Sequence, residues 1–297
     1  MTSAYALSPQ SRAHTSGQTG EHPPQNPRRW SLARAILGWD KPRSPGLRSF
    51  LRAGLRRYLT WNRRLLLDPW LRYYPAVSIL RGSIPLGRSR ILDVGSGSTG
   101  LACFLRMPVV AVDVQFSSPD LARFPSPIQP VRASATNLPF REASFDAVVS
   151  IDMLEHLAQS DRPEAIRELF RVARRIVIVG FPFGASSARF DEEALREERS
   201  KGIRLEWREE HVRHGIPGDE IHREVISAAR EVCSKSVVAW FGQEGLLGLR
   251  LRWKLQSLVT KDSRMYGMLF TPIYWLHARG RRLRAYRRIY VSKVFVA

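Results

Sequence analysis

The sequence predicts an α/β fold built on a doubly wound, mostly parallel sheet, with helical additions before and after it. Short, almost purely apolar runs rich in valine and isoleucine recur from residue 91 onward, as expected of strands covered on both faces. Segments with helical periodicity lie between these runs, and a glycine-rich turn follows the first of them. Strands that alternate with helices in this way predict parallel βαβ units.

The elements follow in order from the pattern. Strands are expected at residues 91–94, 109–114, 145–151 and 176–181. Before the last of these, Asp161 and Glu164 have the spacing of a helix capping box, and a buried helical stripe follows at Ile166, Leu169, Phe170 and Ala173. Beyond Gly184 we expect a charged, irregular segment to about Pro217, a helix over 219–232, a strand at 236–242 and a last strand in "YRRIYVSKVFV".

The chain divides into a short lead segment and one large domain. Residues 1–45 are rich in Ser, Pro, Gln, Gly and Thr and poor in aliphatic side chains, so we expect them to be disordered. The domain is expected over 46–297, with an amphipathic helical lead-in at 46–88 and a helical insertion at about 243–283. The lead-in is either a helix that caps the sheet with solvated arginines or a basic helix that lies on an anionic membrane.

The chain is strongly basic, with a formal net charge of +20 at pH 7. Such a charge suggests a phosphate-rich partner, but here the excess is mostly arginine spread along the chain, which coding bias would also produce. Cys103 and Cys233 form no C-x-x-C pair, so we expect neither a disulfide framework nor a metal site. The N-terminus lacks the apolar core of a signal peptide, which favours a cytoplasmic location.

The turn "ILDVGSGSTG" also matches the dinucleotide pattern G-x-G-x-x-G through Gly95, Gly97 and Gly100. A nicotinamide dinucleotide would place its pyrophosphate on this turn, where the carboxylate of Asp93 would repel it. That carboxylate would instead attract the ammonium group of an amino-acid ligand. Asp113, 20 residues further on, has the spacing for a ribose diol. The pair favours an adenosyl group with a cationic tail.

Four segments in the same order carry a resemblance to a known family: "ILDVGSGSTG", "VVAVDV", "ASATNLPFREASFDAVVSIDMLEHL" and "RELFRVARRIVIVGFP". The sequence resembles the class I S-adenosylmethionine-dependent methyltransferases of the type 11 group over about residues 91–184. The resemblance implies a Rossmann-like class I methyltransferase fold and S-adenosyl-L-methionine as the cofactor. Relatives often have an aspartate where this chain has Ser134, and the third glycine is displaced by one position.

The resemblance also implies which residues bind the cofactor. Asp93, Gly95 and Gly97 would line its methionine portion, Asp113 would accept hydrogen bonds from the ribose, and the loop after the third strand would lie along the adenine. The full set expected at the cofactor is Asp93, Gly95, Ser96, Gly97, Asp113, Val114, Ser134, Ala135, Asn137, Leu138 and Asp152. Alternatively, several of these residues serve the fold alone.

The candidate catalytic residues follow the strand at 145–151, in "DMLEH". Glu155 and His156 are expected at the carboxyl edge of the sheet, where such folds bind ligands, and His156 is the first candidate for a general base. The second candidate is His211, in the polar segment "WREEHVRHGIP", which resembles a segment of bacterial methyltransferases that tailor glycans and polyketide-like compounds. The alternative is that Glu155 and His156 only hydrogen-bond neighbouring loops.

We expect a methyltransferase that acts on a small-molecule, glycan or lipid-linked acceptor. The basic lead-in, the Leu/Arg segment 246–258 and the aromatic segment 265–276 could together form a cationic, apolar face that contacts an anionic membrane from its inner side. An RNA methyltransferase is an alternative, although no N-P-P-Y-type run follows the strand at 145–151. A second alternative is a non-catalytic module that binds adenosylmethionine. The sequence does not determine the oligomeric state.

Overall fold

The protein is built around one seven-stranded sheet with the strand order β3-β2-β1-β4-β5-β7-β6. The computed structural model describes residues 67–97, 100–105, 107–116, 128–234, 236–245, 249–250 and 285–294. The strands are β1 (Ile91–Val94), β2 (Val109–Asp113), β3 (Ile128–Arg132), β4 (Phe145–Ile151), β5 (Ala173–Pro182), β6 (Val237–Gly245) and β7 (Ala285–Lys293). The helices are α3 (Leu67–Ser83), α4 (Ala102–Leu105), α6 (Arg162–Arg171), α7 (Gly184–Ser200), α8 (Glu206–His214) and α9 (Asp219–Val232). Three short 3-10 helices are η1 (Leu86–Arg88), η2 (Leu154–His156) and η3 (Gln159–Asp161).

The first five strands are parallel, as expected, and the last strand is not. β7 lies between β5 and β6 and is antiparallel to both, with Val179 opposite Tyr290 and Trp240 opposite Tyr290 in the two registers. The fold is therefore the mostly parallel, doubly wound sheet that the sequence predicts.

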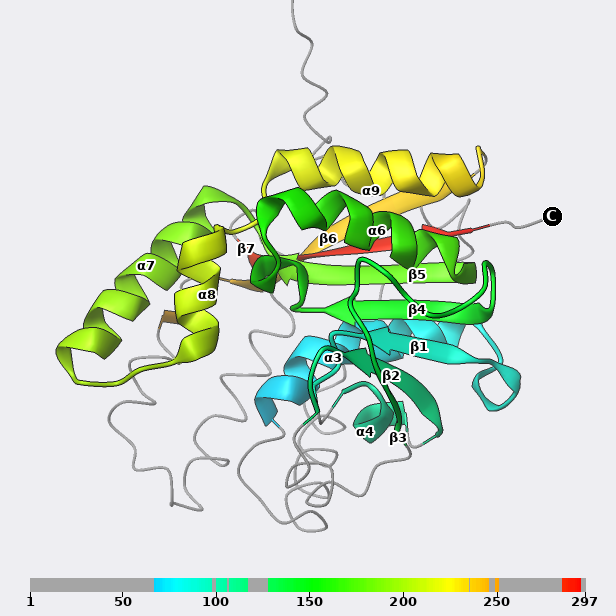
Figure 1. Cartoon of the computed structure of the whole chain (residues 1–297), viewed down its shortest axis with the longest axis horizontal. Coiled ribbons are helices and arrows are strands. Elements are labelled where there is room, and N and C mark those ends of the chain that lie inside the picture. The colour runs from blue at the N-terminus through cyan, green and yellow to red at the C-terminus, as the bar shows by residue number, and fades with distance from the viewer. Residues whose placement is uncertain are drawn as a thin grey trace, which may run out of the picture.

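Helices cover both faces of the sheet (Figure 1). One apolar core lies under α6 and α9, which pack side by side, and includes Ile166, Phe170 and Val225. The other lies under α3 and α4 and includes Leu80 and Phe104. Every residue of β1 and β4 is buried, which explains why these strands read as continuous apolar runs.

Helices α7 and α8 occupy a different place, beyond the carboxyl ends of β4 and β5 (Figure 1). We expected a charged, irregular segment here, and the structure corrects that expectation, because two helices pack against each other and against η2. Their charged residues do not all face solvent, since Asp191, Glu198 and Arg208 are buried. A helix is recognised in a sequence from apolar residues that recur at helical spacing. Where paired charged residues take the buried positions, as they do here, that pattern is weaker.

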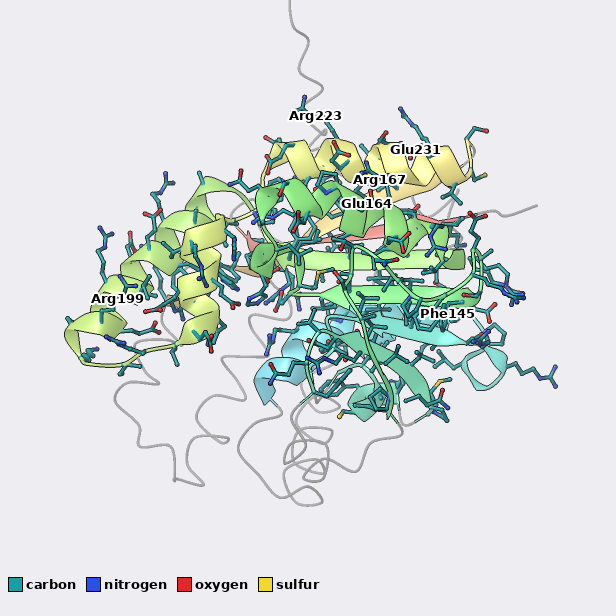
Figure 2. The ribbon with its side chains drawn as sticks, viewed as in Figure 1. Phe145, Glu164, Arg167, Arg199, Arg223 and Glu231 are labelled. Atoms are coloured by element: carbon teal, nitrogen blue, oxygen red, sulfur yellow. The ribbon has the colours of Figure 1, made fainter. Side chains whose placement is uncertain are left out.

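Three further local expectations need correction. β3 was not predicted, because "IQPVR" contains a proline and is mostly exposed, as suits the edge strand that it forms. α6 has no capping box: Asp161 makes no side-chain cap, and Glu164 instead binds Arg167 on the outer face of the helix. Figure 2 shows the side chains of Glu164 and Arg167 on the outer face of α6, and those of Arg223 and Glu231 on the outer face of α9. Ala173 begins β5 and is not part of α6.

Several expectations fall on residues that the structure does not describe. These are the disorder of 1–45, the basic helix from residue 47 to 66, most of the insertion at 243–283, and the segments 246–258 and 265–276, apart from residues 249 and 250. β6 extends to Gly245, slightly past the expected start of the insertion. Among the helices that are described, none has the length and apolar character of a bilayer-spanning segment.

Candidate functional site

The glycine turn after β1 is held tightly on one side and open on the other. Gly95, Gly97 and Gly100 all have positive φ angles, of 72°, 54° and 34°. A β-carbon at Gly95 would lie 2.5 Å from the side chain of Met153, so this position must remain glycine for packing alone. A β-carbon at Gly97 would meet nothing within 4 Å. The side of the turn at Gly97 therefore has room for a ligand.

Asp93 is buried beneath this turn and stabilises it. Asp93 is only 1% exposed, and its Oδ2 accepts a hydrogen bond from the Leu101 N–H at 2.6 Å. Burial raises the pKa of Asp93 to about 7, against the hydrogen bonds from Leu101 and Tyr73, which favour the charged form. Asp93 thus connects β1 to the residues after the turn. A cationic ligand group nearby would favour the charged form of its carboxyl group.

The end of β2 offers the features expected for a nucleoside. Asp113 accepts the Gly97 N–H at 2.8 Å and the Gln115 N–H at 3.3 Å, so its carboxylate lies beside the open part of the turn. The next side chain, Val114, is 62% exposed although it is apolar. An acceptor pair beside an exposed apolar surface suits a ribose with its attached base. Ser96 is turned inward, and its hydroxyl donates to the Gly97 carbonyl.

The loop after β3 meets the expectation in part. The Ser134 hydroxyl accepts the Thr136 N–H and shares a hydrogen bond with the Thr136 hydroxyl, so it is already engaged in a local turn. Ala135 and Leu138 are buried in the core, and the Leu138 N–H donates to Glu168. Their side chains are not free to lie along a ligand. The exposed Asn137 and the loop backbone are the parts of this segment that remain.

Asp152 has a structural partner that the sequence did not reveal. Its carboxylate binds Arg287 of β7 through two hydrogen bonds, of 2.5 and 2.6 Å, and Arg72 of α3 at 3.3 Å. Burial would raise the pKa of Asp152, but the two guanidinium groups hold it below its ordinary value. The residue also has a positive φ of 56°. A direct cofactor contact by this side chain, as expected from the sequence, would compete with two arginines.

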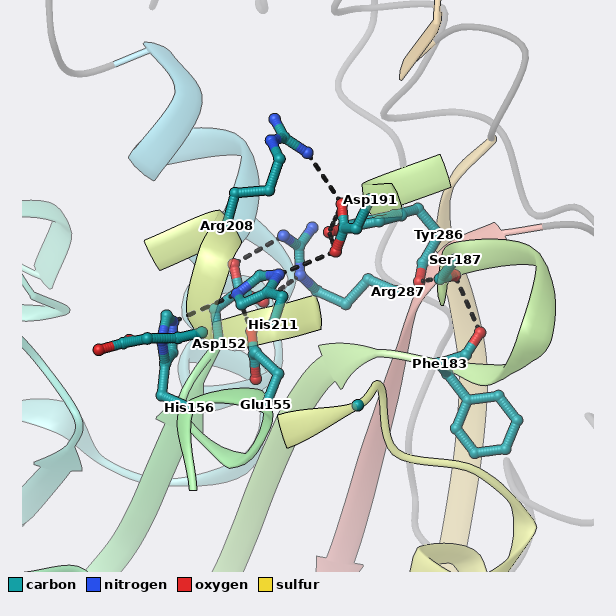
Figure 3. A network of polar contacts seen from close by, with 12 residues as sticks. Asp152, Glu155, His156, Phe183, Ser187, Asp191, Arg208, His211, Tyr286 and Arg287 are labelled. Carbon is teal, nitrogen blue, oxygen red and sulfur yellow. Dashed lines mark hydrogen bonds and ion pairs between the residues drawn. The ribbon is translucent and has the colours of Figure 1, made fainter. Parts of the chain in front are cut away.

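The three candidate catalytic residues come together beyond the carboxyl end of β4 (Figure 3). Glu155 and His156 lie on η2, and His211 reaches them from α8. The two imidazole Nε2 atoms are 3.3 Å apart, and the ring centroids are 4.7 Å apart. His211 Nε2 is 3.8 Å from Glu155 Oε1. The two candidates from distant segments therefore belong to one cluster.

Each imidazole is oriented by a carboxylate. His156 Nδ1 lies 2.6 Å from Glu210 Oε2, and His211 Nδ1 lies 2.8 Å from Asp191 Oδ2. Since an ionised carboxylate only accepts hydrogen bonds, these contacts favour the tautomer with hydrogen on Nδ1 in each ring, and the two Nε2 atoms face each other. Burial, followed by the charge of His211, lowers the pKa of His156, although Glu210 opposes this. The neutral, basic form of His156 is therefore favoured near pH 7.

Asp191 on α7 is the hub that fixes α8 in place. Its carboxylate accepts hydrogen bonds from Arg208 Nη1 at 2.9 Å, from the Tyr286 hydroxyl at 3.0 and 2.9 Å, and from His211. Figure 3 shows these contacts converging from α7, α8 and β7. The hub determines where His211 points, yet nothing near Asp191 in "RFDEEALREERS" distinguishes it from the neighbouring surface acids. Sequence analysis missed it, as it missed Arg287 and Tyr286.

Comparison with known proteins finds one matching family model and several similar solved structures. Residues 92–178 match the family model described as "Methyltransferase domain" (Methyltransf_11). No curated protein matches the chain. A solved structure from Thermotoga maritima, described as an SAM-dependent methyltransferase and possible histamine N-methyltransferase, is similar at 11% identity and a TM-score of 0.44, over 82% of this chain and 98% of that one. The PH0226 protein of Pyrococcus horikoshii is similar at 21% identity and a TM-score of 0.35, over 48% of this chain and 66% of that one.

The family model covers the segments from β1 to β5, which include the glycine turn, Asp113 and η2. The room at Gly97 and the exposed Val114 beside Asp113 fit the adenosyl group of the family's cofactor. The chain therefore carries a class I methyltransferase domain of the type 11 group, with S-adenosylmethionine as its cofactor.

Proposed function

We propose that the chain transfers a methyl group to a hydroxyl group of a small-molecule, glycan or lipid-linked acceptor. The observation that carries this proposal is the pair of imidazoles at the edge of the sheet, each with a carboxylate on Nδ1 and with the two Nε2 atoms 3.3 Å apart. A hydroxyl oxygen is a poor nucleophile until its proton is removed, so it needs a positioned base, whereas a neutral amine does not. The cluster supplies that base.

The site residues would act by positioning and proton transfer. S-adenosylmethionine, when bound, supplies an electrophilic methyl group on a sulfonium. Met153 directly precedes η2, and its side chain packs against Gly95 of the glycine turn. The turn and the histidine cluster are therefore in contact through this residue. His156, whose side chain is 30% exposed, is the histidine that an acceptor can reach, and its Nε2 would take the hydroxyl proton. Glu210 would stabilise the imidazolium that results.

Asp93, Gly97, Asp113, Val114 and Asn137 form the proposed cofactor side of the site. Their support is the open turn, the exposed valine and the exposed loop residue described above. In this proposal Ser96, Ser134, Ala135, Leu138 and Asp152 shape the pocket from behind, because their side chains are buried or already hydrogen-bonded.

We also propose that the enzyme works at the inner face of an anionic membrane. The net charge of +20 and the basic, apolar segments outside the described ranges support this location. Sedimentation with vesicles of an anionic phospholipid at low salt tests it directly, and vesicles of a zwitterionic phospholipid are the control. Equal recovery of protein from both vesicle types would contradict the membrane proposal and leave a soluble acceptor.

The cofactor side is tested first by calorimetric titration of the full chain with S-adenosylhomocysteine and, separately, with NADH. We expect binding of S-adenosylhomocysteine alone, lost in Asp113→Ala and retained in the matched surface variant Gln115→Ala. Binding of NADH instead would overturn the cofactor assignment of the turn.

The acceptor side is tested by transfer of a radiolabelled methyl group to lipid extracts, free glycans and total RNA. We expect label in the lipid or glycan fraction, lost in His156→Gln while S-adenosylhomocysteine still binds. His222→Gln, which changes a histidine on α9 outside the cluster, should retain transfer. Label in RNA would favour the RNA alternative, and binding without any transfer would favour a non-catalytic module.

A further inference from the structure

We propose that Glu155, His156 and His211 form a binding site for one divalent transition-metal ion. The three side chains each offer one ligand atom, and these atoms all lie within 4.8 Å of one another. No metal site was expected from the sequence, because that expectation rested on the cysteines. The two histidines are separated by 55 positions, so no ligand spacing in the sequence points to them.

The first argument is the direction of the two imidazole lone pairs. Glu210 and Asp191 each engage an Nδ1 atom, so the two Nε2 atoms face each other at 3.3 Å and away from these carboxylates. If both Nδ1 atoms carry hydrogen, the Nε2 lone pairs point at each other, an arrangement that a cation between them stabilises, whether a proton or a metal ion. A carboxylate on Nδ1 with the metal on Nε2 is also the arrangement in which histidine commonly binds metals, because the carboxylate fixes the tautomer and raises the basicity of the ring.

The second argument is the state of Glu155. The residue is 0% exposed, and neither carboxylate oxygen has a hydrogen-bond partner among the described residues. A buried carboxyl group without partners is costly in free energy. A metal ion at the cluster would give these oxygens a direct partner in place of the missing hydrogen bonds.

The third argument is distance. Ligand atoms about 2.1 Å from a tetrahedral zinc ion lie about 3.4 Å from each other. The observed separation of the two Nε2 atoms, 3.3 Å, matches this value, and the separation of 3.8 Å between His211 Nε2 and Glu155 Oε1 is larger by only a few tenths of an ångström. The remaining pair, a His156 nitrogen and a Glu155 oxygen, lies within 4.8 Å. Two of the three separations are thus close to those of a tetrahedral metal centre.

The ligand types indicate the class of metal. Two imidazoles and one carboxylate suit zinc and its first-row neighbours manganese, iron and cobalt, and they are a poor set for calcium or magnesium, which prefer oxygen ligands. Three protein ligands leave at least one coordination position open, as in catalytic sites. The partly exposed His156 places that open position on the accessible side of the cluster.

A metal ion here would change how the acceptor is activated. An ion at this site lowers the pKa of a coordinated hydroxyl group, which is the task assigned to the His156 base when the ion is absent. This consequence rests on the proposed function, whereas metal binding itself does not. The two are therefore separable, because binding is measured without any acceptor.

The decisive experiment is a cobalt titration of the untagged full chain after treatment with a chelator. We expect one equivalent of Co²⁺ to bind, with the visible d–d absorption of a site that contains nitrogen ligands. Glu155→Gln and His211→Gln should each abolish this absorption, and His222→Gln should retain it. Failure of the wild-type chain to bind Co²⁺ at millimolar concentration, or undiminished binding by both cluster variants, would overturn the inference.

Two further measurements protect the result against variants that simply fail to fold. Glu155→Gln removes a buried charge without changing shape, so the metal-free variant should melt no lower than the metal-free wild type, while only the wild type gains stability on addition of Co²⁺. Glu210→Gln replaces the carboxylate that contacts His156 Nδ1 by a neutral amide, and it should weaken metal affinity about 10- to 100-fold. If the shift in melting temperature with Co²⁺ is the same in wild type and Glu155→Gln, the site is not where we place it.

If the proposed methyl transfer fails in every acceptor assay, the cobalt titration still stands or falls by itself. The converse result is also informative. If the metal-free enzyme transfers methyl groups at the full rate and the titration still shows one bound Co²⁺, the metal site stands and His156 is again the base.

Discussion

Replacement of Asp93 by asparagine should stabilise the empty protein and weaken cofactor binding. Asparagine has nearly the same shape and can still accept the Leu101 N–H through its carbonyl oxygen. It cannot ionise, however, and in the wild type the ionised form is the one that burial disfavours. The two expected effects have opposite signs, so a simple loss of folding would not reproduce them.

The magnitude follows from the pKa. The folded state raises the pKa of Asp93 from 3.8 to about 7, so it holds the proton more tightly than the unfolded state does. Stability is therefore lost as the pH rises from about 4 to 7, and the loss is complete above pH 7. A tenfold change in proton affinity is worth about 1.4 kcal/mol, so the ionised side chain costs about 4 kcal/mol at pH 8, and about half of that at pH 5.

The assay is chemical denaturation of wild type and Asp93→Asn between pH 5 and pH 8. We expect the stability advantage of the variant to grow by about 2 kcal/mol across this range. Asp146→Asn is the matched control: Asp146 is buried too, but Arg174 and the Arg90 N–H hold its pKa below the ordinary value, so this variant should lose stability at pH 8. A difference between Asp93→Asn and wild type that does not change with pH would refute the reasoning.

Calorimetry of the same Asp93→Asn protein with S-adenosylhomocysteine completes the test. The ligand carries an ammonium group, and the variant has no negative charge to attract it, so affinity should fall by at least tenfold. Unchanged affinity would mean that Asp93 serves only to hold Leu101.

Three further substitutions probe the turn and the hub. Gly97→Ala should cost only about 1 kcal/mol of stability, from its positive φ, but should obstruct cofactor binding; normal affinity for S-adenosylhomocysteine would count against the open side of the turn. Gly95→Ala should cost about 2–4 kcal/mol because the new methyl group overlaps Met153, and a melting temperature equal to that of Gly97→Ala would contradict this. Asp191→Asn should cost about 1.5–3 kcal/mol in urea unfolding, because it removes one of the two carboxylates that pair with the buried Arg208, and a loss below 1 kcal/mol would show that the hub is dispensable.

Much of the central fold is encoded locally and could be predicted. β1, β4 and β5 are continuous apolar runs because both faces of each strand are covered, and the glycine turn is recognisable because three positions need unusual backbone angles. The motif around η2 is local as well, and it brought Glu155 and His156 into consideration. These features depend on neighbours along the chain, so their signal survives in a single sequence.

The edge strand and the two polar helices were harder. β3 carries a proline and few apolar residues, so its pattern is that of a loop, although it pairs with β2 along its whole length. α7 and α8 bury charged residues against one another, which disguises their inner faces as solvent-exposed ones. In both cases the stabilising contacts come from a distant partner and not from local propensity.

By itself the sequence determined the parallel core, the glycine turn that precedes the strand ending in Asp113, and the two histidines worth considering. Only the tertiary structure decided that His156 and His211 meet, across 55 positions, with their Nε2 atoms facing each other. It also decided that Asp152 is bound by Arg287, 135 positions away, and that Asp191 is the anchor of Tyr286, 95 positions away. The physical reason is that periodicity reports which face of an element is buried, whereas the partner on that face depends on how the elements pack.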